Sequence, residues 1–275
     1  MKRFPHIISK LFYEPLILTP QKHGALCQVV EAHMDGKLTA QAEEMPADVE
    51  NDAVKIGGTM IIPVYGVIDQ HIPDSPSGGE GCDVGELSDM IDNARADASV
   101  SRIVFDFRSP GGSVTGVPEL ARKIASILPE EKETVAWTDS ECCSGALWLA
   151  AQCQKFYSTP SASIGSVGVW CAYMDASRAM ENSGQTMQSF SAGKYKLLGA
   201  YWKPMSDEER TIVQKSVDKI YSNFKSAMQT YRSVSDENCG NGLCFDGEEA
   251  ADIGFTDGTM ESLDELLEQL DSNGE

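Results

Sequence analysis

Short apolar runs typical of strands alternate with segments of helical periodicity through the middle of this chain. Residues 59–68, TMIIPVYGVI, are apolar, rich in β-branched residues and bounded by glycines, which predicts a buried strand. Residues 84–94 have apolar positions at helical spacing, and residues 102–107 form a second apolar run. Because strand–helix–strand repeats build parallel sheets, this order predicts an α/β fold with a mostly parallel sheet.

The alternation continues along the chain. Periodicity predicts helices at residues 117–128 and 144–151 and strands at 134–137 and 155–157. An S-x-x-E capping box at residues 206–209 predicts the start of a long amphipathic helix. The remaining expected elements are helices at 24–34 and 172–182, a strand at 185–190, and a short, acidic, peripheral helix at 262–270.

Three regions follow from this pattern. We expect an N-terminal arm and acidic linker at residues 1–55, one main domain at 56–258, and an acidic C-terminal tail at 259–275. The formal net charge is −20, and the 22 Lys and Arg residues are scattered. A chain of this kind has no basic groove for phosphates, so nucleic acid is not an expected partner.

Cysteine spacing and hydropathy indicate the compartment. The eight cysteines form no CxxC pair and no Cys/His spacing of a zinc site, so no metal is expected. Several lie in apolar segments, as reduced cysteines do in a reducing compartment. The basic N-terminus has an interrupted apolar stretch, and no window of eighteen apolar residues follows. We therefore expect a cytoplasmic protein without a membrane anchor.

Ser144 is a candidate nucleophile, because it lies at a small-residue turn that enters an expected helix. A helix cap or a close-packing residue is the alternative interpretation. A serine nucleophile also needs a base nearby. No histidine lies in a motif-like setting, whereas Lys194 and Lys196 share one face of an extended segment and become bases if burial lowers their pKa. Solvated surface lysines are the alternative. The four histidines are His6, His23, His33 and His71.

A glycine turn supplies a third element. Gly111 and Gly112 directly follow the strand expected at residues 102–107, in the sequence SPGGS. Backbone amides without side chains around them approach a developing oxyanion closely. A simple tight turn is the other interpretation.

Together these motifs resemble the signal peptide peptidase A family of serine proteases, particularly its phage branch of head maturation (capsid assembly) proteases. That family belongs to the Clp protease/crotonase superfamily, so the resemblance implies a Clp/crotonase-like β-α superhelix. It spans residues 59–258, and LFYEPLILTPQKHGAL resembles the N-terminal arm of the phage enzymes. The matching segments are IIPVYGVI, FDFRSPGGSV, CSGALWLAAQCQKFYSTPSASIGSVGV, SAGKYK, VDKIYSNFKSAMQTYR and FDGEEAADIGFTDG.

The resemblance implies a Ser-Lys dyad. The family nucleophile falls on Ser144, and the lysine of its G-x-x-K segment falls on Lys196, 52 residues later. By the same match Gly112 and Gly145 form the oxyanion hole and Ser166 supports the lysine. No metal or organic cofactor is implied. By this match Lys194 is only a neighbour of the base, and Lys203 is a more distant alternative base. Cys143, in the unusual pair Cys142–Cys143, is a minor alternative nucleophile.

The resemblance also implies a biological role. We expect a homo-oligomeric endopeptidase that cleaves phage capsid, scaffold or portal proteins during prohead maturation, inside the assembling procapsid in the host cytoplasm. Three alternatives stay open: a signal peptide peptidase-like cytoplasmic or membrane-associated peptidase, an inactive capsid assembly scaffold, and a crotonase-type acyl-CoA enzyme.

Overall fold

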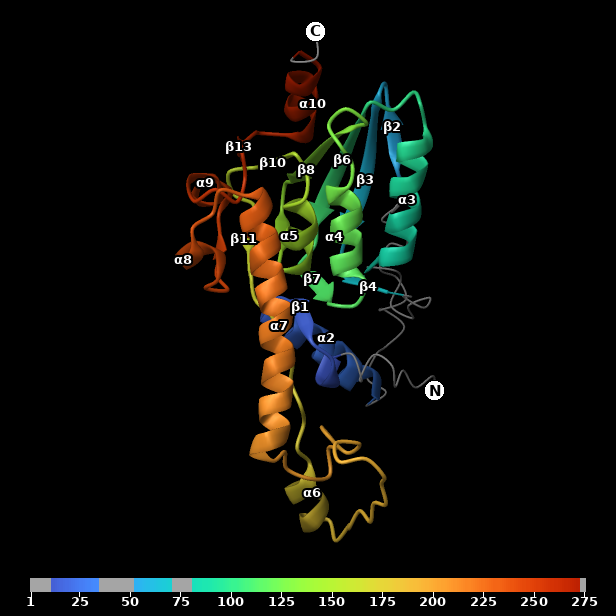
Figure 1. Ribbon diagram of the computed structural model, residues 1–275, viewed down its shortest axis with the longest axis vertical. Coiled ribbons are helices and arrows are strands. Elements are labelled where there is room, and N and C mark those ends of the chain that lie inside the picture. The colour runs from blue at the N-terminus through green and yellow to red at the C-terminus, as the bar shows by residue number, and fades with distance from the viewer. Residues whose placement is uncertain (1–10, 35–51, 71–80, 273–275) are drawn as a thin grey trace.

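A six-stranded sheet forms the centre of the protein (Figure 1). The computed structural model describes residues 11–34, 52–70 and 81–272. Within the sheet only the edge strand β2 runs antiparallel to its neighbour, β3; the other pairings are parallel, which confirms the expected α/β class with a mostly parallel sheet. Its order is β13 (Gly258–Thr259), β10 (Lys155–Ser158), β8 (Glu133–Thr138), β6 (Arg102–Arg108), β3 (Thr59–Tyr65) and β2 (Val54–Ile56).

Three helices cover one face of this sheet: α3 (Val84–Ala96), α4 (Val117–Ala125) and α5 (Gly145–Ala150) (Figure 1). Apolar side chains at helical spacing bury one side of α3 and α4, as the sequence predicts. α4 ends three residues earlier than expected, and the exposed Leu128 lies beyond it. All six residues of α5 are buried, so this helix lies inside the core.

The other face of the sheet is covered by the C-terminal helix α10 (Leu263–Ser272). Leu266 and Leu270 are buried there against the sheet residues Val104, Val135 and Trp137. The expectation of a peripheral helix is therefore wrong. The i, i+4 spacing of the two leucines is enough to place an otherwise acidic helix on an apolar surface.

Two smaller sheets carry the turns singled out in the sequence. One has the order β1 (Leu16–Leu18), β7 (Gly111–Ser113), β4 (Val67–Asp69), β5 (Gly81–Asp83), and the other β12 (Cys244–Phe245), β11 (Ser163–Gly165), β9 (Glu141–Cys143). The single strand expected at residues 59–68 is wrong, because Gly66, with φ 76°, divides it into β3 and β4. β1 comes from the expected N-terminal arm, yet it pairs with β7 of the main domain. The domain boundaries stay a prediction.

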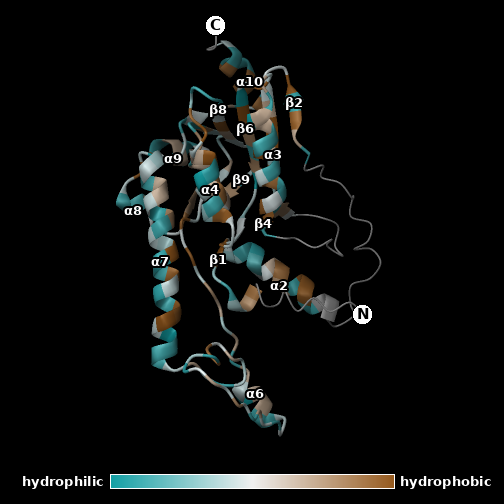
Figure 2. Cartoon of the chain, turned by 45° about the vertical axis from the view of Figure 1, so that its right-hand side comes forward, coloured by the Kyte–Doolittle hydropathy of each residue, from teal (hydrophilic) through white to brown (hydrophobic). Residues whose placement is uncertain are grey.

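The long helix α7 (Asp207–Tyr231) begins at the expected capping box and runs along the body. Its buried residues Phe224 and Met228 pack on the core, whereas its first turns extend away from it (Figure 1). Residues 171–206 form an arm at that far end, without a single buried residue, and Figure 2 shows α6 (Ser177–Asn182) at its tip.

The arm departs from the sequence prediction. The helix expected at residues 172–182 is only six residues long. Residues 185–190 are exposed coil rather than a strand, because the described residues place no strand beside them. The structure also describes the helices α2 (Pro20–Met34), α8 (Asp236–Cys239) and α9 (Gly247–Asp252). In the described ranges no helix is both long and apolar enough to cross a membrane.

Candidate active site

Ser144 lies at the junction between β9 and α5. Its backbone has φ 53° and ψ −115°, a conformation that costs a residue with a Cβ about 1–3 kcal/mol. The residue is buried, and its amide donates a hydrogen bond to the Gly165 carbonyl at 2.8 Å. The expected strand-to-helix turn is therefore present, and the surrounding backbone holds it in a strained conformation.

Ser166 is strained in the same way. Among the described residues other than glycine, only Ser144 and Ser166 have positive φ, and that of Ser166 is 57°. Ser166 directly follows Gly165, and its amide donates to the Leu243 carbonyl at 2.7 Å. The two strained residues are thus neighbours across the hydrogen bond between Ser144 and Gly165. In the described part of the chain, no hydrogen bond joins Ser166 to Lys196, the residue that the family resemblance implies it supports.

Glycines bring β7 against the Ser144 turn. Gly111 has φ 95°, and a Cβ at this position would stand 2.8 Å from the Gly145 amide nitrogen. A Cβ on Gly112 would stand 1.7 Å from the Ile68 carbonyl oxygen. Only glycine permits such close backbone approaches. The structure therefore brings Gly111, Gly112, Gly145 and Ser144 together.

Ser109 joins the two turns, a role that the sequence reasoning missed. Its hydroxyl donates to the Gly66 carbonyl at 2.6 Å and accepts from the Gly111 amide at 3.2 Å. The Ser109 amide donates to the Glu141 backbone carbonyl at 2.8 Å, and the Ser109 carbonyl accepts from the Cys143 amide at 3.0 Å. A serine directly before Pro-Gly-Gly is a signal for such local bonding, because short hydroxyl side chains bond to nearby backbone.

Cys143 precedes Ser144 and faces Cys244 across the glycine of β11. The two sulfurs are 3.6 Å apart, and both residues lie opposite Gly165 in the three-stranded sheet. The hydrogen bond to Cys244, together with burial, raises the pKa of the Cys143 thiol well above its ordinary value. The same bond lowers the pKa of Cys244 to about 7. Since the thiolate is the reactive form, this environment disfavours Cys143 as a nucleophile.

Lys196 lies far from Ser144 within one chain. It is exposed and belongs to the arm, at the end of α7 that extends away from the body (Figure 1). α7 begins after Ser206, and further along the helix the ring of Phe224 stacks on Trp148 of α5. The eighteen helical residues between these points span about 27 Å. A single chain therefore does not bring the lysine to the serine.

The other two lysines of the arm are paired with acids at the start of α7. Lys194 Nζ lies 2.6 Å from Glu208, and Lys203 Nζ lies 2.7 Å from Glu209. The hydrogen bond to Glu208 raises the pKa of Lys194, which is the opposite of what a general base requires. In the described ranges Lys196 has no ion pair.

The one histidine whose side chain the structure describes contacts Leu11 and Trp170 rather than Ser144. His23 of α2 is within hydrogen-bonding distance of the Leu11 carbonyl, at 2.8 Å, and its ring meets that of Trp170 edge to face at 4.6 Å. The others lie outside the described residues: His6, His71 and the side chain of His33. Over those same described residues, no cluster of three His, Cys, Asp or Glu side chains is arranged to bind a metal.

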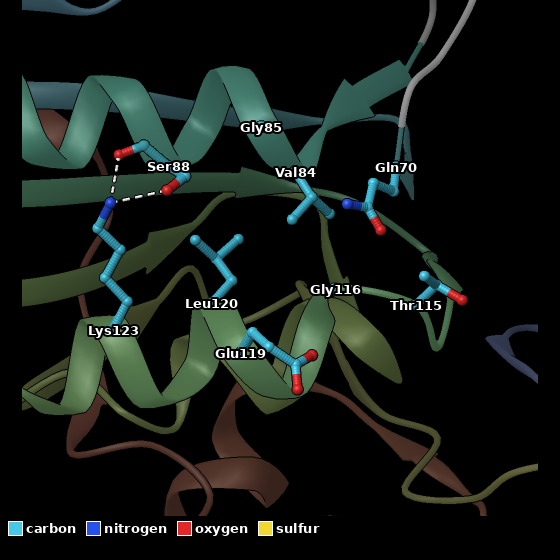
Figure 3. A pocket seen from close by; sticks show the side chains of 9 residues that line it. All are labelled: Gln70, Val84, Gly85, Ser88, Thr115, Gly116, Glu119, Leu120 and Lys123. Atoms are coloured by element: carbon cyan, nitrogen blue, oxygen red, sulfur yellow. Dashed lines mark hydrogen bonds between the residues drawn. The ribbon is translucent and has the colours of Figure 1, made fainter.

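A separate cavity of about 500 Å³ lies between α3 and α4 (Figure 3). Its lining includes Val84, Gly116 and Lys123, and the ammonium group of Lys123 is held by the carbonyl and hydroxyl oxygens of Ser88 at 2.9 and 2.7 Å. None of the expected site residues lines it. The cavity is therefore distinct from the Ser144 site.

Residues 127–273 match the profile of peptidase family S49. The match covers more than half of the chain and includes both Ser144 and Lys196, whereas Gly112 precedes it.

Curated relatives include both cellular and phage proteins. A protein of Methanocaldococcus jannaschii named as a protease is 30% identical over 66% of this chain and 60% of its own length. The head-tail preconnector protein GP5 of Enterobacteria phage P21 is 25% identical over 96% of this chain and 57% of its own. Capsid assembly protease C of Escherichia phage lambda is 24% identical over 99% of this chain and 66% of its own length. The chain thus spans between 57% and 66% of these relatives' lengths.

Proposed function

Because the chain belongs to peptidase family S49, we propose that it is a serine endopeptidase with Ser144 as its nucleophile. The observation that carries this proposal is the strained backbone of Ser144, at a strand-to-helix turn beside the Gly111–Gly112 strand. Strain of this kind concentrates at catalytic residues, where the surrounding structure maintains it. A helix cap alone does not account for it, since the Ser144 side chain makes no capping hydrogen bond.

The proposed reaction is acyl transfer with a Ser-Lys dyad. Neutral Lys196 accepts the proton of Ser144 Oγ, which attacks the scissile carbonyl, while the Gly112 and Gly145 amides stabilise the oxyanion. The C–N bond breaks as the lysine protonates the leaving amine. Water then attacks the acyl-enzyme with the same lysine as base, which releases the second product and restores the serine. Ser166 supports the lysine, and no metal or cofactor takes part.

The proposed dyad requires a second copy of the chain, because the arm holds Lys196 away from the Ser144 of its own chain. In an assembly, the lysine reaches the serine of a neighbouring copy. The arm is suited to contact another protein, since Phe190 is 95% exposed and Tyr195 and Tyr201 are each 40% exposed. Docking against a neighbour also removes water from the lysine, which disfavours its charged form.

Phage capsid, scaffold or portal proteins are the substrates we propose. The two phage relatives align over 96% and 99% of this chain, including the N-terminal region that precedes the family match. The enzyme would then act inside the procapsid, in the host cytoplasm. A signal peptide peptidase-like role is the second candidate, because an Enterococcus faecium protein named as a signal peptide peptidase is 25% identical over 64% of this chain and 52% of its own length. An inactive scaffold is disfavoured by the presence of both Ser144 and Lys196.

Protein cleavage tests this function directly. Wild type, Ser144→Ala and Lys196→Ala are each incubated with phage coat, scaffold and portal proteins, and new termini are mapped by mass spectrometry. We expect cleavage by wild type and none by either variant. Lys194→Ala, two residues from the proposed base, is the matched control and should cleave normally. Cleavage that survives both substitutions would rule out the dyad.

A further inference from the structure

Strand β1 lies within the candidate active site. It pairs antiparallel with β7, so that Ile17 faces Gly112 and Leu18 faces Gly111. On its other edge, Leu16 and Trp170 exchange backbone hydrogen bonds of 2.7 and 3.1 Å, and the Trp170 indole donates to the Leu18 carbonyl at 2.9 Å. The chain's own N-terminal region is therefore bonded on both edges, as an extended peptide bound by strand addition would be.

The register of β1 on β7 places one carbonyl of β1 opposite a proposed oxyanion donor. The Thr19 amide donates to the Pro110 carbonyl at 3.2 Å, which identifies these residues as a hydrogen-bonded pair. In antiparallel strands such pairs recur at every second residue. The next pair is Ile17 with Gly112, so the Gly112 amide points at the Ile17 carbonyl oxygen.

The second proposed donor lies at the same carbonyl. The position that a Gly111 Cβ would occupy is 2.1 Å from the Ile17 carbonyl oxygen and 2.8 Å from the Gly145 amide nitrogen. A Cβ on Gly145 would stand 3.3 Å from that oxygen and 2.9 Å from Ile17 Cδ1. The Ile17 carbonyl thus lies against both glycine turns, and its side chain covers Gly145 next to Ser144.

We propose that residues 16–18 form a substrate-like strand that occupies the peptide-binding cleft and competes with substrate, so that the wild type is less active than a chain whose strand has left the cleft. The Ile17–Leu18 bond then has the position of a scissile bond. This inference rests on the proposed function, because it takes the Gly112 and Gly145 amides as the oxyanion donors. It also defines the substrate class: an extended peptide with an aliphatic residue on each side of the bond that is cut.

The surroundings of β1 favour a strand that stays in the cleft and blocks it, here called a plug, over a strand that is cleaved as a substrate. Leu16, Ile17 and Leu18 are all buried, at 3%, 0% and 2% exposure. The segment after the bond is held as well, because Thr19 bonds to Pro110 and leads directly into α2. Two ends held in place on both sides of a cut re-form the bond more readily than they separate.

Peptide binding to the full-length chain tests the plug. The probe is a fluorescent peptide with the sequence of residues 12–22, FYEPLILTPQK, and its affinity is measured by anisotropy. Ile17→Glu places a charge at a fully buried position and should release the strand. We expect this variant to bind the peptide at least about tenfold more tightly than wild type, because the internal competitor is gone. Val29→Glu, at an exposed position in α2, is the matched control and should behave as wild type.

Hydrogen exchange provides a second readout that needs no catalysis. In Ile17→Glu the amide of Gly112, which points at the Ile17 carbonyl, should exchange faster than in wild type. If circular dichroism shows that Ile17→Glu is unfolded, Ile17→Ala replaces it and should change both readouts in the same direction. Unchanged exchange and affinity in a folded variant would overturn the inference, as would a wild-type chain found cut between Ile17 and Leu18. If both readouts show that the strand is released but the protein cleaves no substrate, the proposed function is refuted, whereas the inference that β1 occupies the cleft is supported.

Discussion

Trp148 in α5 stacks on Phe224 in α7, with ring centroids 4.7 Å apart and planes only 3° from parallel. Both rings are buried. Trp148 is four residues from Ser144, and Phe224 belongs to the helix that carries the arm with Lys196. The stack therefore fixes the direction of the arm relative to the candidate nucleophile of the same chain.

Replacing Phe224 with alanine should destabilise the protein strongly. A fully buried aromatic truncated to alanine loses about 3–5 kcal/mol of unfolding free energy. Urea denaturation followed by circular dichroism measures the change. Phe190→Ala removes the same side chain from a position that is 95% exposed, and should change the free energy of unfolding by less than about 0.5 kcal/mol. Equal effects of the two substitutions would contradict the packing of α7 on α5.

Gly111→Ala should abolish peptide cleavage, because the new Cβ would stand 2.8 Å from the Gly145 amide nitrogen and push the two turns apart. Loss of one oxyanion donor alone lowers kcat by about 10²–10³-fold. Gly57→Ala is the matched control: Gly57 also has positive φ, but a Cβ there meets no atom within 4 Å. It should cost about 1 kcal/mol of stability and leave kcat unchanged. Similar kcat losses in both variants would indicate backbone strain rather than the close approach.

Mixing two inactive variants should restore cleavage if the dyad forms between copies. Ser144→Ala supplies Lys196, and Lys196→Ala supplies Ser144. With equal amounts and random assembly, about one quarter of the sites contain both functional groups, since each site takes one residue from each neighbour. Initial rates of peptide cleavage before and after mixing measure this recovery. No recovery after full subunit exchange would place both groups of the active dyad in the same chain.

Asp106→Asn should change the pH dependence of stability. Burial raises the pKa of Asp106, although a hydrogen bond from Tyr65 and the charge of Arg108 oppose this. A raised pKa means that the folded state favours the protonated acid. The contribution of Asp106 to the free energy of unfolding is therefore fully present below the ordinary pKa of aspartate, and it is lost as pH rises through the pKa of Asp106 in the folded protein. Relative to wild type, the variant should gain stability between acidic and neutral pH. Urea denaturation across that range measures the difference, and exposed Asp252→Asn should show none.

Local patterns in the sequence predict most of the fold. Helical periodicity and the capping box identify α3 and α7, and β-branched runs identify the central strands. The missed features depend on distant partners. Among the residues that the structure describes, the expected strand at 185–190 has no neighbour to pair with. The Leu-Ile-Leu of β1 becomes a strand because β7 and Trp170 offer it two edges.

The candidate site divides in the same way. The strained turn at Ser144 and its approach to Gly111 are encoded locally, by small residues between a strand and a helix. The separation of Lys196 from Ser144 is not encoded locally, because it depends on where α7 packs against the body. A spacing of 52 residues identifies a pair of candidate groups without indicating whether one chain or two must supply them.

The central claim is that Ser144 is the nucleophile, and its chemical labelling is the most direct test. The protein is incubated with excess fluorophosphonate, digested, and the modified residue located by tandem mass spectrometry. We predict an adduct on Ser144 in wild type and in Ser140→Ala, an exposed serine of the same turn region, and no adduct in Ser144→Ala. An adduct on Cys143, or labelling that persists in Ser144→Ala, would contradict the assignment.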